Sequence, residues 1–335
     1  MQLSVLMAVR DGGSYFRAAM DSLLGQSFPD FEFIVVDDGS SDGTTALLEA
    51  YRQRDPRLRV LRNDTSRGLP VSLNRGLALC RAPLVARADA DDIHHPDRLA
   101  KQLAHLHAHP RIGVLSCGFH RIDPGDQRID TRVPVTGDAR IRFRMLFTNS
   151  LLNPGAMFRT ALVRAVGGYD LRYWTAEDTD LWARLMPVTR FDNLPEPLVS
   201  YRIHPSSAVR TRGEVGDALS LSVPARLQAH YLGYPPGDRE VRAAVDLFQD
   251  LRFLEREDIR IGHQHLRAIL AQAGSREPTA VLGDFHARVA ASLRRQARLR
   301  ARRDPGRALY VLGKTIQWWL VRPGAGTRLA PATSS

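Results

Sequence analysis

The stretch "VVDDGSSDGT", residues 35–44, decides between two folds. A helix-loop-helix calcium site needs oxygen donors at alternate positions, a turn glycine and a closing glutamate. This pattern is matched by Asp38, Ser40, Asp42, Gly43 and Glu49. If the same loop instead follows a buried strand, it is the kind of loop that holds a nucleotide. The residues before it distinguish the two interpretations.

The segment that leads into this loop is predicted to be a strand. "FEFIVV", residues 31–36, is a short apolar run rich in β-branched residues, which is typical of a strand buried on both faces of a parallel sheet. Residues 14–28 carry apolar side chains at helical spacing, and residues 3–9, "LSVLMAV", form another apolar strand. The order strand, helix, strand, loop, helix is that of a doubly wound α/β sheet. We therefore favour the nucleotide-binding loop.

Length and charge limit the function further. The 335 residues suffice for one large domain with an appendage. No run reaches the roughly 18 apolar residues of a membrane span, and the N-terminal apolar run does not resemble a secretory signal. Residues 285–335 contain eleven Arg and Lys residues and one acid, so ten of the eleven net positive charges lie there. Because the rest of the chain is nearly neutral, we expect no nucleic-acid partner. The two cysteines, Cys80 and Cys117, lie in apolar stretches and indicate a reducing compartment, so we expect a cytoplasmic protein.

Two acidic clusters are candidates for chemistry. Asp89, Asp91 and Asp92 follow a predicted strand, where they raise one another's pKa unless a cation such as Mg²⁺ or Mn²⁺ offsets them. The alternative is that they solvate a turn and cap the next helix. Glu177 and Asp178 begin another predicted helix. Acids at this position are either simply stabilised by the helix dipole or serve as a general base.

A histidine follows a further predicted strand. His204 lies in "YRIH", and its imidazole could complete a metal site begun by the aspartates. A lone histidine is otherwise an ordinary surface or core residue. The sequence pattern leaves both roles open.

Taken together, these segments resemble the bacterial glycosyltransferases of family 2. The resemblance rests on residues 3–44, "ARADADDIHHPDRL", "GGYD", "AEDTDLWARL" and "YRIH", in the order and spacing of that family. It implies an α/β GT-A (Rossmann-like) fold with a mixed, mostly parallel sheet flanked by helices. It also implies metal-dependent, inverting transfer of a sugar, with Mn²⁺ or Mg²⁺ as cofactor. The donor would be a nucleotide-diphosphate sugar, a UDP-sugar being favoured, and the acceptor a hydroxyl of a glycan or lipid-linked molecule in cell-surface polysaccharide synthesis.

The resemblance also implies roles for individual residues. Asp38 would accept a hydrogen bond from the nucleotide base, and Asp89 would approach the ribose. Asp91, with Asp89 and His204, would hold the metal. Asp178 would be the general base, with Glu177 as the less favoured choice. The nucleotide pocket would include Arg67, Gly68 and Asn74.

One position departs from the family. Many relatives have a tyrosine after the first strand, where the ring packs on the base, whereas this chain has Arg10. A guanidinium can also stack on a base plane. Tyr169 and Trp174 could form part of an acceptor site or could be core residues. A catalytically inactive nucleotide-sugar-binding module is the alternative function, and an Asp178→Asn variant would distinguish it.

Three regions are expected along the chain. Residues 1–212 would form the catalytic domain, residues 213–284 a helical appendage, and residues 285–335 a basic amphipathic tail. In the tail, helical spacing places an apolar stripe beside many arginines, which suits an anionic membrane surface on the inner face of the cytoplasmic membrane. The alternative is a helix that docks on the protein. The stripe consists of Leu309, Leu312, Ile316 and Trp319, with Trp318 and Leu320 beside it.

Overall fold

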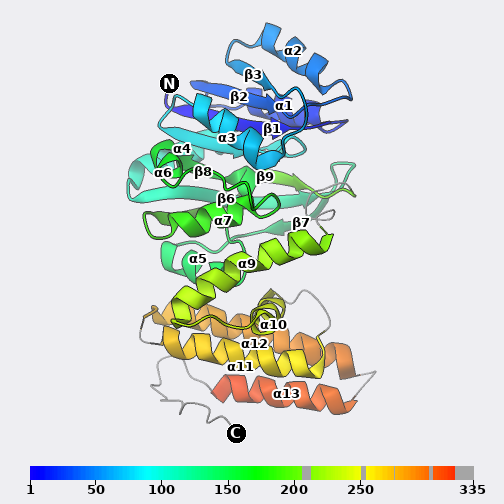
Figure 1. The fold of residues 1–335 in the computed structure, drawn as a ribbon, viewed down its shortest axis with the longest axis vertical. Helices are drawn as coiled ribbons and strands as arrows, with labels where there is room; N and C mark the ends of the chain where they lie inside the picture. The colour runs from blue at the N-terminus through cyan, green and yellow to red at the C-terminus, as the bar shows by residue number, and fades with distance from the viewer. Residues whose placement is uncertain (206–212, 250–253, 275, 302–304, 321–335) are drawn as a thin grey trace. The chain divides into compact units, whose positions relative to one another are not determined.

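The computed structural model describes residues 1–205, 213–249, 254–274, 276–301 and 305–320 (Figure 1). Contacts divide the chain into two compact units. Unit 1 comprises Met1–Ile141 and Ser150–Ser220, and unit 2 comprises Arg142–Asn149 and Leu221–Ser335. A short segment in the middle of the first unit's sequence therefore belongs to the second unit.

Unit 1 is built on a nine-stranded sheet. The strands are β1 (Leu3–Val9), β2 (Phe31–Asp37), β3 (Leu58–Arg62), β4 (Leu84–Ala88), β5 (Ile93–His94), β6 (Ile112–Ile122), β7 (Arg128–Arg132), β8 (Met157–Arg159) and β9 (Arg190–Arg202). Their order is β3-β2-β1-β4-β8-β6-β9-β5, and β7 pairs with β6. The β3-β2-β1-β4 portion is parallel, as is the β6–β9 pair, whereas β8 runs antiparallel to β4 and β6, and β5 antiparallel to β9.

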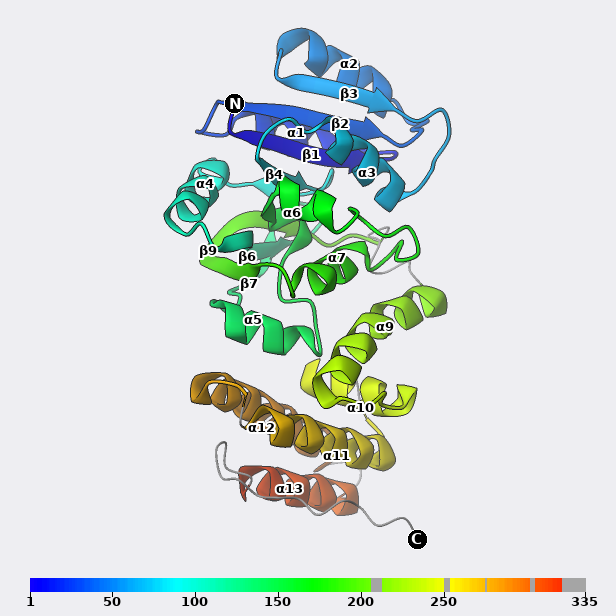
Figure 2. The same cartoon turned by 60° about the vertical axis from the view of Figure 1, so that its left-hand side comes forward.

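Helices flank this sheet (Figures 1 and 2). They are α1 (Phe16–Leu24), α2 (Thr44–Arg54), α3 (Leu69–Leu79), α4 (Arg98–Ala108), α5 (Asp138–Met145), the 3₁₀ turn η1 (Asn153–Gly155), α6 (Thr160–Ala165) and α7 (Glu177–Leu185). The mixed, mostly parallel sheet with its flanking helices confirms the predicted fold class. The predicted exposed or edge strand is β3, which ends the sheet and buries little besides Leu58.

The core of unit 1 explains why β1 and β2 form its centre. Every residue of β2 is buried, and β1 is buried apart from Ala8, which is half-buried. Phe16 and Met20 of α1 pack into the same cluster as Val5 and Phe33. Because both faces of these strands are covered, their sequences are continuous apolar runs rather than alternating ones. The buried strands fix the loops that leave their carboxyl ends.

Unit 2 is helical. Its described helices are α9 (Gly213–Leu232, which begins in unit 1), α10 (Asp238–Gln249), α11 (Arg256–Ala273), α12 (Thr279–Ala301) and α13 (Pro305–Leu320). Phe143 and Phe147, from the segment Arg142–Asn149, join an aromatic cluster with Phe248 and Phe285, with ring centroids 4.6–6.2 Å apart. These rings explain why that segment belongs to unit 2.

The last described helix has two apolar faces. Trp318 is buried on α12: its Nε1 donates to the backbone oxygen of His286 at 2.9 Å. Leu309, Leu312 and Ile316 are instead 69%, 44% and 62% exposed. The helix therefore docks through one face and presents the predicted stripe with the other. The rest of that stripe, the side chains of Trp319 and Leu320, lies outside the described residues. Among the described helices, none has the length and apolar character required to cross a membrane.

Candidate active site

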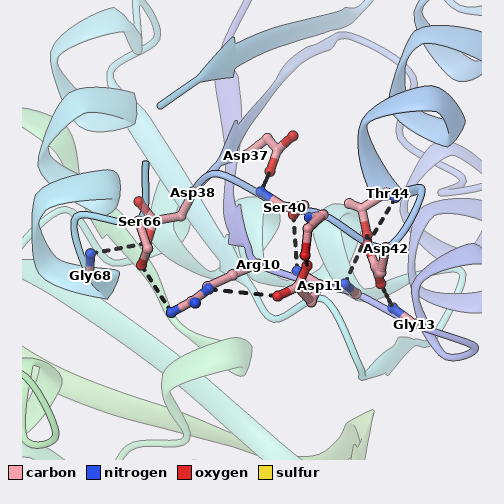
Figure 3. Close-up of polar contacts among 12 residues, drawn as sticks. Arg10, Asp11, Gly13, Asp37, Asp38, Ser40, Asp42, Thr44, Ser66 and Gly68 are labelled. Atoms are coloured by element: carbon pink, nitrogen blue, oxygen red, sulfur yellow. Dashed lines mark hydrogen bonds and ion pairs between the residues drawn. The ribbon is translucent and has the colours of Figure 1, made fainter. Parts of the chain in front are cut away.

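The loops that follow β1 and β2 are bound to each other. Asp11 accepts a hydrogen bond from Ser41 N at 2.7 Å. The loop after β1 donates three backbone N–H groups to the loop after β2, each at 2.9 Å: Asp11 N to Ser40 Oγ, Gly12 N to Thr44 Oγ1 and Gly13 N to Asp42 Oδ2 (Figure 3). This network fixes the backbone at the carboxyl end of β1, where a parallel sheet binds ligands.

The same network shows that the calcium interpretation is wrong. The loop is entered from β2 rather than from a helix. Asp42 uses its carboxylate on Gly13 N and on Thr44, and Glu49 pairs with Arg52 at 2.6 Å. Across the described residues, the three-ligand cluster that could hold a metal lies at the end of β4 and not in this loop.

Asp38 is the centre of a second network. Its two carboxylate oxygens accept five hydrogen bonds, all from the segment that follows β3 and begins α3. Burial disfavours its ionised form, but the hydrogen bonds outweigh burial and lower its pKa. Asp38 therefore fixes the loop that contains two predicted nucleotide-pocket residues. The donors are Asn63 Nδ2, Ser66 Oγ, Arg67 N, Gly68 N and Ser72 Oγ.

Arg10 joins the two networks. Its Nη1 donates to Ser66 Oγ at 3.1 Å, and Ser66 in turn donates to Asp38 Oδ2 at 2.8 Å (Figure 3). Most of the Arg10 side chain is exposed. The guanidinium is thus linked to Asp38 through the Ser66 hydroxyl, while most of it faces solvent.

The carboxylates at the end of β4 form a tight cluster. Oxygen atoms of Asp89, Asp91 and Asp92 all lie within 4.8 Å of one another. Burial, followed by repulsion from Asp91 and Asp89, raises the pKa of Asp92 well above its usual range. Asp92 is fully buried, and its Oδ2 has no hydrogen-bond partner in the described residues. The predicted ligand set did not include Asp92, although its position directly after Asp91 was an available signal.

His204 is brought to this cluster by β9. Its Nε2 lies 2.9 Å from Asp91 Oδ2, although the two residues are 113 positions apart. β9 pairs with β5, which directly follows the acidic stretch, so sheet pairing carries the histidine to the aspartates. The structure therefore places together Asp89, Asp91 and His204, the three predicted metal ligands.

A buried arginine contacts the carboxylate cluster at the end of β4. Arg87, on β4, is fully buried and donates from Nη2 to Asp89 Oδ1 at 2.5 Å. Burial disfavours its charge, but Asp89, Tyr169 and Glu177 more than compensate and raise its pKa. The Arg87 guanidinium therefore hydrogen-bonds to Asp89 of the first acidic cluster and is stabilised by the charge of Glu177 from the second. Arg87 was not among the predicted site residues; its signal in the sequence is a charged residue inside an apolar strand.

The acids at the start of α7 have three different environments. Asp180 is fully buried and pairs with Arg184 Nε at 2.7 Å, so it has a structural role. Burial, followed by the charge of Asp178, raises the pKa of Glu177 to about 8. Burial also raises the pKa of Asp178, which is half-buried and accepts from Thr179 N at 2.6 Å. The charge of Asp178 thus disfavours the ionised form of its neighbour Glu177.

Tyr201, on β9, has carboxylates of both acidic clusters near it. Its pKa is raised by burial and then by the negative charges of Asp92, Asp89, Asp91 and Asp178. Carboxylates that lie up to 89 positions apart in the sequence therefore raise the pKa of the same hydroxyl. Sequence analysis did not single out Tyr201, and only its place in "YRIH" marked it.

The remaining predicted site residues are Asn74, Tyr169, Trp174 and Arg67. Asn74 holds the turn before α7, since its amide donates to Tyr169 O at 2.7 Å and accepts from Tyr169 N at 2.8 Å. Tyr169 is 1% exposed and packs in the core, the second of the two roles considered for it. Trp174, by contrast, is 48% exposed. The side chain of Arg67 is exposed in the loop that Asp38 organises.

The cluster at the end of β4 has the chemistry of a divalent-cation site. Its donors are carboxylate oxygens and an imidazole nitrogen, a set that suits Mn²⁺ and that offers Mg²⁺ its preferred oxygen ligands. The buried Asp92 Oδ2 has no described hydrogen-bond partner, and burial and repulsion raise the pKa of Asp89 and Asp92. A bound cation would relieve each of these costs, so the residues present fit a metal.

Comparison with known proteins assigns the class. Residues 4–167 match the profile of "Glycosyl transferase family 2". The chain is 30% identical over 213 residues to the O-antigen biosynthesis glycosyltransferase WbnJ of Escherichia coli, covering 62% of this chain and 82% of that protein. It is 28% identical to the amylovoran biosynthesis glycosyltransferase AmsE of Erwinia amylovora over 58% of this chain and 73% of that protein. The chain belongs to glycosyltransferase family 2, and the protein is a glycosyltransferase.

Solved structures confirm the GT-A fold. S. aureus TarS in complex with UDP-GlcNAc matches with a TM-score of 0.58 at 20% identity, over 95% of this chain and 89% of that one. The mannosyltransferase PcManGT from Pyrobaculum calidifontis, in complex with GDP-Man and Mn²⁺, matches with a TM-score of 0.54 at 19% identity, over 95% and 87% of the two chains. At such identities the likeness establishes the fold.

Proposed function

We propose that this enzyme transfers a sugar from a nucleotide-diphosphate sugar, preferably a UDP-sugar, to a hydroxyl of a glycan or lipid-linked acceptor, and that residues 1–212 carry out the reaction. One observation carries the proposal: oxygen atoms of Asp89, Asp91 and Asp92 lie within 4.8 Å of one another at the end of β4, and His204 Nε2 lies 2.9 Å from Asp91 Oδ2. The relatives that make O-antigen and amylovoran support a role in cell-surface polysaccharide synthesis.

The donor nucleotide would bind beside Asp38 and Arg10. Arg10 would stack on the base, while Asp89 would approach the ribose, and Arg67, Gly68 and Asn74 would line the pocket. A carboxylate has about four lone-pair sites, and Asp38 already accepts five hydrogen bonds. A base N–H would therefore replace one donor. Ser66, whose hydroxyl can rotate, is the donor that leaves at least cost.

Asp91, Asp89 and His204, with Asp92, would hold Mn²⁺ or Mg²⁺. When bound, such a cation stabilises the negative charge that develops on the leaving nucleoside diphosphate. Arg87 would offset part of the cost of ionising the buried Asp89 and hold it in place, since it donates to that carboxylate at 2.5 Å. These residues position the donor without becoming covalently attached to it.

The pair that begins α7 would supply the general base. With a pKa raised to about 8, Glu177 holds a proton at neutral pH and is the less favoured base, whereas Asp178 is only half-buried and is the favoured one. Asp178 would take the proton of the acceptor hydroxyl as that oxygen attacks the anomeric carbon. The nucleoside diphosphate would leave with the electrons of the broken bond, so a single displacement inverts the configuration. Trp174, exposed in the loop before α7, would offer the acceptor an aromatic face.

The acceptor could be presented at a membrane. We place the protein in the cytoplasm, with the exposed stripe of α13 on the anionic inner face of the cytoplasmic membrane, where basic residues of the tail add attraction. Leu312→Glu and Ile316→Glu should each reduce binding to vesicles that contain phosphatidylglycerol by several-fold. Gln317→Glu adds the same charge at a neighbouring exposed position and serves as the control. A full-length protein that ignores such vesicles at physiological salt would exclude this location.

Nucleotide binding tests the proposed activity. We would follow thermal shift and calorimetry of the purified protein with UDP, GDP, dTDP and CDP, each with and without Mn²⁺. One nucleotide, with UDP expected, should bind only with Mn²⁺, and Asp91→Ala should abolish that binding. Asp97→Ala is a suitable control, because this neighbouring carboxylate makes no capping hydrogen bond at the start of α4. Binding of none of the four nucleotides, with or without metal, would overturn the proposal.

A further inference from the structure

A second buried arginine lies next to the candidate metal site. Arg202 ends β9, two residues before His204, and only 1% of its side chain is exposed. Burial of a guanidinium is costly unless its donors are used. The position of its partners therefore indicates what this arginine does.

Arg202 contacts the acidic stretch after β4 at two points. Its backbone N–H donates to Asp92 Oδ1 at 2.8 Å, and its Nε donates to the backbone oxygen of Asp91 at 2.9 Å. The first contact fixes one oxygen of a buried carboxylate, and the second fixes the main chain of the residue that faces His204. One residue thus determines where two of the candidate ligands lie.

The other end of Arg202 is anchored outside the site. Its Nη1 donates to Asp123 O at 3.1 Å and pairs with Asp126 Oδ1 at 2.6 Å, in the turn between β6 and β7. Its guanidinium carbon also lies 4.5 Å from the ring centroid of Tyr15, and the Tyr15 ring lies 5.1 Å from that of His204. The arginine therefore connects the β6–β7 turn and the loop before α1 to the metal ligands.

We propose that Arg202 is a positioning residue that holds Asp91, Asp92 and His204 in the arrangement a divalent cation requires. This inference rests on the metal use proposed above. A lysine cannot replace it, because one ammonium cannot reach the Asp91 carbonyl and the β6–β7 turn in the planar geometry of a guanidinium. Asp126, 61% exposed and outside the acidic cluster, is expected to act on the site only through Arg202.

The test is the affinity for Mn²⁺, measured by the loss of the free Mn²⁺ signal in electron paramagnetic resonance. Arg202→Lys should weaken binding by about 10- to 100-fold, the range known for residues that orient metal ligands. Asp126→Asn should weaken it by roughly three-fold or more, as a partial loss of the same support. Arg159→Lys is the matched control: this half-buried arginine donates to Leu106 O and Ile112 O and contacts no candidate ligand.

The outcomes separate this inference from the proposed function. A wild-type protein that does not bind Mn²⁺ would overturn the proposed metal use, and the role of Arg202 with it. A wild type that binds while Arg202→Lys binds equally well would overturn the role of Arg202 alone. If Arg202→Lys does not fold, as judged by circular dichroism, Asp126→Asn decides, and an unchanged affinity in that variant would overturn the inference. Equal weakening by Arg159→Lys would mean that the loss of any structural arginine weakens Mn²⁺ binding, and it would overturn the specific role of Arg202.

Discussion

The ends of β2 and β4 both carry aspartates, but the pKa is lowered at the end of β2 and raised at the end of β4. Asp38 follows β2 and accepts five hydrogen bonds, which lower its pKa. Asp89, Asp91 and Asp92 follow β4 and crowd together, and the pKa values of Asp89 and Asp92 are raised. An acid at the carboxyl end of a parallel strand can therefore organise the loops of a site or form its cation-binding part. The number of donors around the carboxylate separates the two roles.

The largest expected effect concerns Asp178, whose pKa is raised like those of the acids after β4. Asp178→Asn should lower turnover by about 10²–10⁴, because the acceptor hydroxyl loses its base. Nucleotide binding should be largely kept. Release of nucleoside diphosphate and calorimetry measure the two quantities. Asp180→Asn is the contrasting variant: it breaks the buried pair with Arg184 and should lower stability instead. Wild-type turnover in Asp178→Asn would favour another base.

The two strand ends should respond differently when a carboxylate is removed. Asp38→Ala should lower the free energy of unfolding by roughly 3–5 kcal/mol, because it leaves several buried donors without an acceptor. Asp92→Asn should change it by less than about 1 kcal/mol in the absence of metal, because it relieves repulsion. Urea denaturation in EDTA measures both. Equal destabilisation by the two variants would remove the distinction between the strand ends.

The pH dependence of stability should also differ. The folded-state pKa of Asp92 is raised, so its contribution to stability is complete below the unfolded value near 4 and is lost as pH rises through the folded pKa. Asp38 has a lowered pKa, so its contribution is lost as pH falls through that value. Between pH 4 and 7, the unfolding temperature of the metal-free protein should therefore fall more steeply in wild type than in Asp92→Asn. Identical slopes in differential scanning fluorimetry would contradict this assignment.

The smallest expected effect belongs to Glu177. Its folded-state pKa of about 8 means that its stabilising contribution is lost as pH rises through about 8. Glu177→Gln should therefore flatten the fall in unfolding temperature between about pH 5 and 8, the range between the unfolded and folded pKa values, while lowering turnover less than Asp178→Asn does. If Glu177→Gln instead abolished turnover and Asp178→Asn did not, Glu177 would be the base.

The sequence predicted the features that depend on local pattern. Apolar runs located β1 and β2, and the motif spacing located the acids of β4 and α7 and the histidine after β9. It did not predict Arg87 or Arg202, since a buried guanidinium depends on carboxylates and carbonyls supplied by distant segments. For the same reason it could not show that Asp38 is surrounded by donors.

The division into units was also beyond local pattern. Arg142–Asn149 belongs to unit 2 because Phe143 and Phe147 pack on Phe248 and Phe285, more than 100 positions away. The first residues of that segment lie in α5, but its local sequence contains no signal for its distant partner. The tail shows the same limit: spacing identified the stripe of Leu309, Leu312 and Ile316, but not which face of α13 is buried.

Metal-dependent cleavage of the donor tests whether the acids at the end of β4 hold a cation. Nucleoside diphosphate release from a panel of nucleotide sugars would be measured with the purified enzyme as isolated, after EDTA treatment, and after Mn²⁺ is restored. We predict that release from one donor, a UDP-sugar, falls to background with EDTA and returns with Mn²⁺. In this assay water accepts the sugar. Release that EDTA does not change would contradict the assignment of a cation to the acids at the end of β4.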